Sequence, residues 1–182
     1  MTKFKKIEDS RVVISELMLP SHSNFNGKIH GGYILSLLDQ IAFACASKHS
    51  GTYCVTASVD TVDFLKPIEI GELVTMKASV NYTGNSSMVI GIRVEAENIQ
   101  TGQKKHCNSS YFTMVAKDKE GKSMQIPGLI LETEDDIRRF AKSIKRNKMK
   151  FKNKKEFNDT DFASEEYLHI LEEHKVKIER TD

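Results

Sequence analysis

Two stretches in the middle of the chain alternate apolar and polar residues with a period of two. Apolar side chains occupy every even position from 74 to 82 within residues 73–82, and every even position from 88 to 96 within residues 88–98. Such alternation is typical of half-buried antiparallel strands. The short segment Thr83-Gly84-Asn85-Ser86 between them has the composition of a hairpin loop. The two stretches therefore predict an antiparallel sheet.

Three further segments are predicted to be strands. Residues 11–19 are rich in β-branched side chains and end at Pro20, and residues 53–65 are rich in Val and Thr. Residues 105–117 carry apolar side chains on both faces near their end, as a central strand does. A helix over roughly residues 31–48 follows the first strand, so the expected order is β-α-β-β-β-β.

The predicted helix is apolar on nearly every side, so other parts of the protein must cover it. A strongly curved antiparallel sheet wrapped around this one central helix is the simplest arrangement, and it places the fold in the α+β class. Such a sheet keeps an open edge, which invites pairing with another strand. We therefore expect at least a dimer, formed by two sheets that join edge to edge.

Glycine and proline divide the chain of 182 residues into two parts. All ten glycines and all three prolines lie at or before Gly128. We predict a folded domain over residues 1–128 and a charged, helical extension over residues 129–182. The small net charge of +2 gives no general reason to expect binding to nucleic acid or to a membrane.

The extension has three regions. Residues 132–147 begin with acidic and end with basic side chains, which suits a helix dipole. Residues 142–155 contain eight Lys or Arg and no acid, and we expect this basic block to be extended and solvated. Apolar spacing returns within residues 159–179, where we expect a short amphipathic helix.

The three cysteines are not clustered, and no apolar segment has the length of a signal peptide or a membrane span. We therefore expect a cytoplasmic protein with neither a disulfide framework nor a metal site.

Residues 23–39 are the strongest candidates for chemistry. Here a polar loop leads through Gly31 and Gly32 into the helix that carries Asp39. The first N–H groups of a helix have no partner in the helix, so a glycine pair there can polarise a carbonyl group. A carboxylate buried in an apolar helix is costly unless it is used, which favours Asp39 as a base. The alternatives are a glycine turn and an Asp39 that faces solvent or a partner subunit.

Several motifs together resemble one family. Leu19-Pro20, the loop from Ser23 to Gly32 and Leu38-Asp39 are similar to the signature of hotdog-fold acyl-CoA thioesterases. Residues 59–60, 64–68, 71–72 and 84–87 match the same family. Within this family the chain resembles the bacterial YciA-like enzymes and the brain-type cytosolic acyl-CoA hydrolases. The resemblance covers roughly residues 10–128.

The resemblance implies a hotdog fold and the hydrolysis of acyl-CoA to a free acid and CoA. It implies that backbone N–H groups of Gly31 and Gly32 polarise the thioester carbonyl. Asp39 would act as general base or nucleophile, and Asn24 would position the substrate or the water. The family further implies active sites at a dimer interface, a hexamer built as a trimer of dimers, and no cofactor beyond the CoA of the substrate.

The resemblance also suggests residues that contact CoA. Lys66 is the first choice for its phosphates, because related enzymes often carry arginine where this chain has Asn85. Lys77 and the basic block are the alternatives. Ser86 and Ser87 are expected to donate to CoA, Thr56 to line the acyl or pantetheine channel, and His30 to contact the substrate beside the glycine pair.

Other functions stay open at the level of sequence. One is a hotdog protein that senses acyl-CoA without cleaving it. Another is a dehydratase that uses His30 as its acid or base. The basic block would have a role of its own if it bound CoA phosphates, a neighbouring subunit or RNA.

Overall fold

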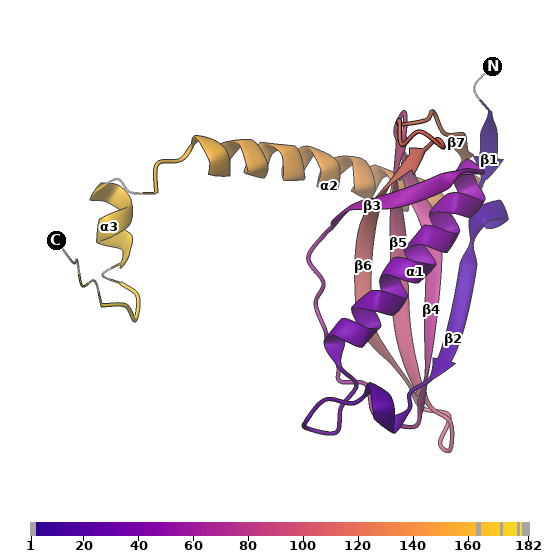
Figure 1. Cartoon of the computed structure of the whole chain (residues 1–182), viewed down its shortest axis with the longest axis horizontal. Coiled ribbons are helices and arrows are strands. Elements are labelled where there is room, and N and C mark those ends of the chain that lie inside the picture. Colours follow the sequence, from indigo (N-terminus) through magenta and orange to yellow (C-terminus); the bar gives the residue numbers. More distant parts are fainter. Residues whose placement is uncertain (1–2, 163–164, 172, 178, 180–182) are drawn as a thin grey trace. The chain divides into compact units, whose positions relative to one another are not determined.

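In the computed structural model, five antiparallel strands form one sheet in the order β2-β4-β5-β6-β3 (Figure 1). Every predicted strand is present, and β6 is an interior strand as predicted. The last predicted residues of β3, 60–65, form a loop instead. The strands are β2 (Val12–Leu17), β3 (Tyr53–Val59), β4 (Glu72–Thr83), β5 (Ser87–Asn98) and β6 (Lys104–Lys117).

The structure describes residues 3–162, 165–171, 173–177 and 179. The chain forms two compact units, residues 1–144 and 145–182, and each is described by itself.

A second, two-stranded parallel sheet pairs β1 (Phe4–Lys6) with β7 (Gly128–Ile130). The sequence analysis did not predict it, because strands of three residues are too short to show a period. Short 3₁₀ helices lie at Glu8–Ser10 and Pro20–His22.

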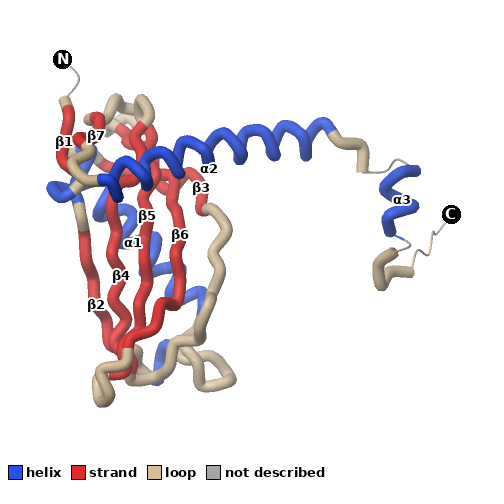
Figure 2. Tube along the Cα trace, turned by 180° about the vertical axis from the view of Figure 1, so that it is seen from behind, coloured by secondary structure: helices blue, strands red, loops and turns tan. Residues whose placement is uncertain are grey.

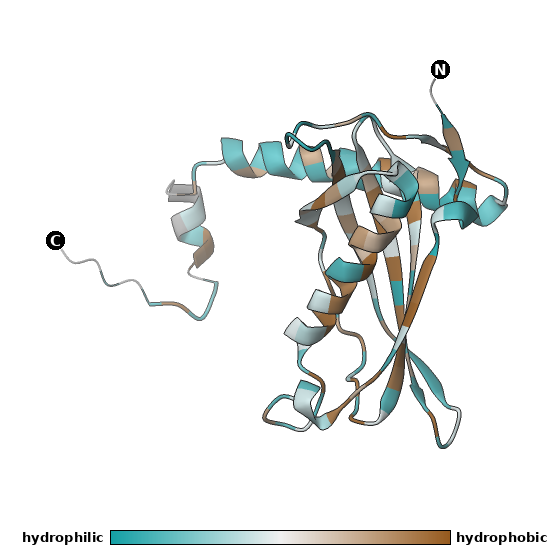
Figure 3. Cartoon of the chain, turned by 45° about the vertical axis from the view of Figure 1, so that its right-hand side comes forward, coloured by the Kyte–Doolittle hydropathy of each residue, from teal (hydrophilic) through white to brown (hydrophobic). Residues whose placement is uncertain are grey.

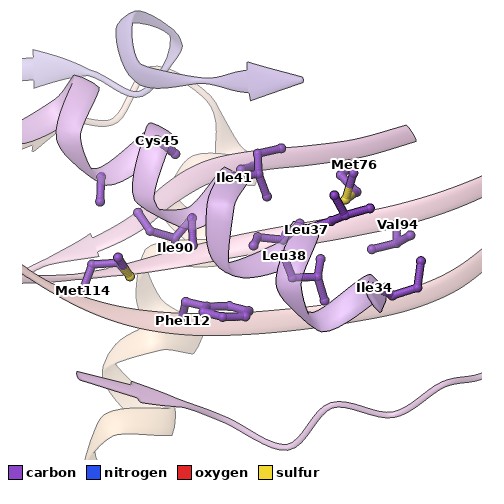
Figure 4. Close-up of a cluster of buried hydrophobic side chains, with 14 of the residues drawn as sticks. Ile34, Leu37, Leu38, Ile41, Cys45, Met76, Ile90, Val94, Phe112 and Met114 are labelled. Carbon is purple, nitrogen blue, oxygen red and sulfur yellow. The ribbon is translucent and has the colours of Figure 1, made fainter. Parts of the chain in front are cut away.

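Helix α1 (Gly31–Ser50) packs on the sheet with one face only (Figure 4). That face buries apolar side chains against the sheet, and each such side chain contributes about 1.5–3 kcal/mol relative to exposure. The helix supplies Ile34, Leu37, Leu38, Ile41 and Cys45, and the sheet supplies Met76, Ile90, Val94, Phe112 and Met114.

The opposite face of α1 is exposed in the single chain, and Leu35, Ser36, Asp39 and Phe43 lie on it. The predicted curved antiparallel sheet around one central helix is confirmed, and in the single chain it covers one side of α1. Figure 3 shows α1 mixing hydrophilic and hydrophobic residues along its length.

The start of α2 (Glu134–Asp159) packs on the other face of the sheet from α1 (Figure 2). The Phe140 ring lies 5.2 Å from the Tyr82 ring, and Arg139 donates to Ser79 Oγ at 3.4 Å. The first unit consequently continues to Ile144, past the predicted limit at residue 128.

The second unit contains the rest of α2 and α3 (Glu165–Leu171). The basic block, residues 142–155, is helical and not extended as expected. Lys and Arg are good helix formers, and their exposed side chains keep the charges in water. The predicted helix within 159–179 is limited to α3, and residues 163–164, 172 and 178 of that prediction lie outside the described residues. None of the described helices is long and apolar enough to cross a membrane.

Candidate active site

His30 caps the start of α1. Its Nδ1 accepts the Gly32 N–H at 3.0 Å, and its backbone carbonyl accepts the N–H of Tyr33 at 3.0 Å. Sequence analysis expected both glycine N–H groups to be free, but in this conformation Gly32 is already bonded. The Gly31 N–H has no hydrogen-bond partner among the residues that the structure describes, so it is the donor left for a ligand oxygen.

Phe64 lies directly against Gly31. A Cβ atom at Gly31 would approach the Phe64 ring to 3.4 Å. The loop that carries Phe64 is held on β6, where the Leu65 N–H donates to the Cys107 carbonyl at 2.9 Å. Buried Asn108 also holds this loop, because its Nδ2 donates to the Asp63 carbonyl at 2.9 Å.

Sequence reasoning missed the role of Asn108. Its only signal was an asparagine within a predicted strand, a residue type that is depleted there.

Asp39 and Thr56 form a hydrogen-bonded pair between α1 and β3. Thr56 Oγ1 donates to Asp39 Oδ1 at 2.5 Å, and both residues are exposed in the single chain. The expectation of a buried Asp39 was wrong for one chain, because no strand covers this face of α1. The contact of Thr56 with the substrate channel stays a prediction. The structure brings Thr56 to the candidate base, which the sequence did not reveal.

Asn24 lies in the tight loop before α1. Its Oδ1 accepts the N–H of Asn26 at 2.9 Å and of Lys28 at 3.2 Å. These bonds fix the side chain and leave Nδ2 as its donor to other groups. The next residue, Phe25, is fully exposed at the loop tip. The loop is further held by an ion pair between Lys28 and Glu69 at 2.6 Å.

The two halves of the predicted catalytic group are far apart within one chain. Asp39 lies eight residues after Gly31, which is about 12 Å along the axis of α1. A carbonyl oxygen bound at about 3 Å from the Gly31 nitrogen is therefore out of reach of Asp39 in the same chain. Within one chain the two predicted groups therefore do not meet.

The predicted CoA contacts also lie at opposite ends of the sheet. Lys66 comes directly after Leu65, whose N–H donates to the Cys107 carbonyl on β6. The hairpin that carries Asn85 lies at the other end of β6, where the Ala116 N–H donates to the Ser86 carbonyl at 2.9 Å. Ser87 pairs with Val115. Cys107 and Val115 are eight residues apart on β6, or about 26 Å. The structure thus separates Lys66 from Asn85, Ser86 and Ser87 within one chain.

The surroundings of Asp39 are apolar and uncovered. We call Leu35, Asp39, Phe43, Tyr53 and Val59 the Asp39 face. All five are exposed, Tyr53 by 62%, and the rings of Phe43 and Tyr53 lie 5.6 Å apart. The face borders β3, an edge strand of the sheet. An exposed apolar patch beside an open strand edge is typical of a protein–protein interface.

The described part of the chain holds no group of three His, Cys, Asp or Glu side chains arranged for a metal ion.

Comparison with known proteins identifies the family. Residues 26–103 match the family model described as the thioesterase superfamily. Protein VdlD of Helicobacter pylori is 43% identical over 141 residues, which cover 78% of this chain and 80% of VdlD. The chain belongs to the thioesterase superfamily.

Two further relatives have names that describe an acyl-CoA thioester hydrolase. An uncharacterized acyl-CoA thioester hydrolase of Bacillus subtilis, YkhA, is 37% identical over 75% of this chain and 78% of YkhA. The mouse cytosolic acyl coenzyme A thioester hydrolase is 36% identical over 72% of this chain, which spans only 35% of that enzyme.

Solved structures of the superfamily confirm the predicted hotdog fold. A hexameric acyl-CoA thioesterase superposes with a TM-score of 0.81 and 34% identity, covering 83% of this chain and 97% of that one. An acyl-CoA hydrolase of Staphylococcus aureus, solved with butyryl-CoA and CoA, has a TM-score of 0.79 and 30% identity, covering 85% and 94% of the chains. Its alanine variants of one aspartate, one asparagine and one threonine have also been solved.

Proposed function

We propose that this protein hydrolyses acyl-CoA thioesters to a free acid and CoA, with Asp39 as general base. The observation that carries the proposal is the bond from Thr56 Oγ1 to Asp39 Oδ1 on the uncovered face of α1. This bond fixes the carboxylate and leaves Oδ2 to accept a proton. Membership in a superfamily that contains acyl-CoA hydrolases supports the choice of substrate.

The alanine variants of the S. aureus enzyme support the choice of residues. There the substituted asparagine precedes the substituted aspartate by 15 positions, and the substituted threonine follows the aspartate by 17. Asn24, Asp39 and Thr56 have the same residue types at the same spacing.

The proposed reaction has two stages. Asp39 Oδ2 takes a proton from a water molecule as that water attacks the thioester carbonyl carbon. The negative charge that develops on the carbonyl oxygen is stabilised by the Gly31 N–H at the positive end of the α1 dipole. The tetrahedral intermediate then expels the CoA thiolate, which receives the proton from Asp39. In the alternative, Asp39 attacks the carbonyl itself and water hydrolyses the resulting anhydride.

We further propose that each site is shared by two copies of the chain. Gly31 and Asp39 of one chain are about 12 Å apart along α1. Asn24 and Gly31 of one copy would therefore form a site together with Asp39 and Thr56 of the other. The uncovered Asp39 face and the open edge of β3 supply the surface for this pairing. The hexameric relatives support a trimer of such dimers.

A hydrolysis panel over acyl-CoA chain lengths tests the function. We expect the wild type to release CoA, and Asp39→Asn to lose about 10²–10⁴-fold in kcat with its fold retained. Gln40→Ala is the matched control, since the side chain of its exposed neighbour Gln40 bonds, among the described residues, only to Ser36 Oγ, at 3.3 Å. Wild-type turnover by a folded Asp39→Asn protein, or no turnover by the wild type on any chain length, rejects the proposal.

A further inference from the structure

The loop that connects β3 to β4 approaches the start of α1 at Phe64 (Figure 1). The Phe64 ring is 48% exposed in the single chain. A Cβ atom at Gly31 would lie 3.4 Å from this ring, which is an ordinary van der Waals contact. Glycine at position 31 therefore leaves a methyl-sized space between the helix start and the ring. This space lies beside the Gly31 N–H, the donor that has no partner among the described residues.

Both peptide groups that flank Phe64 are bonded to β6. On one side, Asn108 Nδ2 donates to the Asp63 carbonyl at 2.9 Å. On the other side, the Leu65 N–H donates to the Cys107 carbonyl at 2.9 Å. Because a peptide group is planar, fixing the two groups around one residue fixes its backbone dihedral angles and the direction in which its side chain leaves the chain. The ring is thus half exposed and yet directed at the helix start.

Asn108 is an unusual residue for its position. It is fully buried within β6, opposite Val94 of β5. Its Oδ1 has no hydrogen-bond partner in the described part of the chain. A buried polar atom without a partner lowers stability, and asparagine is depleted in strands, so an amide here calls for an explanation. The bond that its Nδ2 makes to the Phe64 loop supplies one.

We propose that the Phe64 ring covers the thioester carbonyl bound at the Gly31 N–H, and that Asn108 is the positioning residue that holds the ring there. The inference rests on the proposed function. An apolar ring beside the donor keeps water from the carbonyl oxygen, and a hydrogen bond to developing negative charge is stronger where water is excluded. Without the bond from Asn108 the ring moves away, and water competes for the Gly31 N–H.

A double-mutant cycle in kcat tests whether Asn108 acts through Phe64. Asn108→Leu removes the donor and keeps a side chain of similar size. We expect kcat for acyl-CoA to fall about 10-fold and KM to change less than about 2-fold, because the shielded charge develops only in the transition state. Phe64→Ala should cause a similar loss of kcat, and adding Asn108→Leu to it should cost little more.

Ser110→Ala is the matched control for this cycle. Ser110 is also fully buried in β6, and its hydroxyl has no hydrogen-bond partner within the described residues, so kcat should stay at the wild-type value. An unchanged kcat in Asn108→Leu contradicts the proposal, and so do losses that multiply in the double variant. If Phe64→Ala instead breaks up the assembly in light scattering, the ring serves the contact between copies and the proposal is overturned.

A fluorescence measurement tests the loop without any need for hydrolysis. The chain has no tryptophan, so Phe64→Trp introduces a single reporter at the position of the ring. Adding Asn108→Leu should raise the acrylamide quenching constant at least about 2-fold, because the loop loses one of its bonds to β6. Adding Ser110→Ala should leave the constant unchanged. Equal quenching with and without Asn108→Leu rejects the positioning role. If the wild type hydrolyses no acyl-CoA, the proposed function fails, and the quenching still decides whether Asn108 holds the ring.

Discussion

Thr56 Oγ1 donates a hydrogen bond of 2.5 Å to Asp39 Oδ1, and this bond joins the edge strand β3 to the uncovered face of α1. It orients the carboxylate from a strand that the sheet holds rigidly. The bond therefore makes Thr56 a positioning residue for the proposed base.

Thr56→Val removes the donor and keeps the shape of the side chain. We expect kcat for acyl-CoA to fall about 10-fold or more while KM changes little, because a hydrogen bond to a charged group is worth about 1.5–3 kcal/mol. Thr56→Ser keeps a hydroxyl and should retain most of the activity. Equal kcat values for the Val variant and the wild type would show that this bond does not serve catalysis.

His30 is predicted to stabilise α1 as its N-cap residue. His30→Ala should lower the free energy of unfolding by about 1 kcal/mol in denaturant titrations, and His30→Asn should restore most of it, because Asn is a good N-cap residue. His30→Asn should also keep its hydrolytic activity. If this variant were stable but inactive, His30 would act on the substrate and not only through the cap.

The pH dependence of stability should show the effect of the lowered pKa of buried His49. The pKa of this histidine is lowered mainly by burial, and Lys5 lowers it further, whereas the Pro127 carbonyl and Asp9 oppose the shift. Its ring meets Ser10 Oγ at 3.4 Å and the Pro127 carbonyl at 3.0 Å.

Because the folded state favours neutral His49, its contribution is complete above the unfolded pKa of 6.5 and is lost as pH falls from there toward the lower folded pKa. We expect the free energy of unfolding to drop between pH 7.5 and 5.5, and His49→Gln to show a smaller drop. The same slope in both proteins would exclude His49 as the cause.

Alanine at position 91 is expected to lower the stability of the protein. A Cβ there would clash with the side-chain amide of Asn81, which is buried on the face of the sheet against which α2 begins. Gly91→Ala should lose about 1–3 kcal/mol of stability through this clash. Asn81→Ala in the same chain should recover part of the loss, so a double-mutant cycle measures the contact. Additive effects would contradict it.

Local sequence patterns were enough to predict most of the fold. The alternation in β4 and β5 predicted two strands within one residue of their bounds, because one face of each strand packs on α1. The prediction for the basic block was wrong, because the charge density was given more weight than the helix propensity of Lys and Arg. The pairing of β1 with β7 joins residues more than a hundred positions apart, which no local pattern encodes.

The candidate site was predictable only in part. Asn24, Gly31 and Asp39 were chosen from residue type and spacing, but their separation depends on the length of α1. The pairing of Thr56 with Asp39 and the anchoring of the Phe64 loop by Asn108 arise from contacts between distant segments. Sequence alone favoured a buried Asp39 over one that faces solvent or a partner subunit, because it did not show that the sheet covers only one side of α1.

The central claim is an acyl-CoA hydrolase whose sites are each built by two copies. Co-expression of two variants, each altered in one half of the site and each expected to be nearly inactive alone, tests it most directly. When Asn24→Ala and Asp39→Asn chains pair at random, half of the dimers are mixed and each mixed dimer contains one native site. We predict that acyl-CoA hydrolysis recovers to about a quarter of the wild-type rate. Co-expressed Asp39→Asn and Thr56→Val chains, altered in the same half of the site, should gain no native site. No recovery with the first pair, despite mixed dimers, would contradict the account.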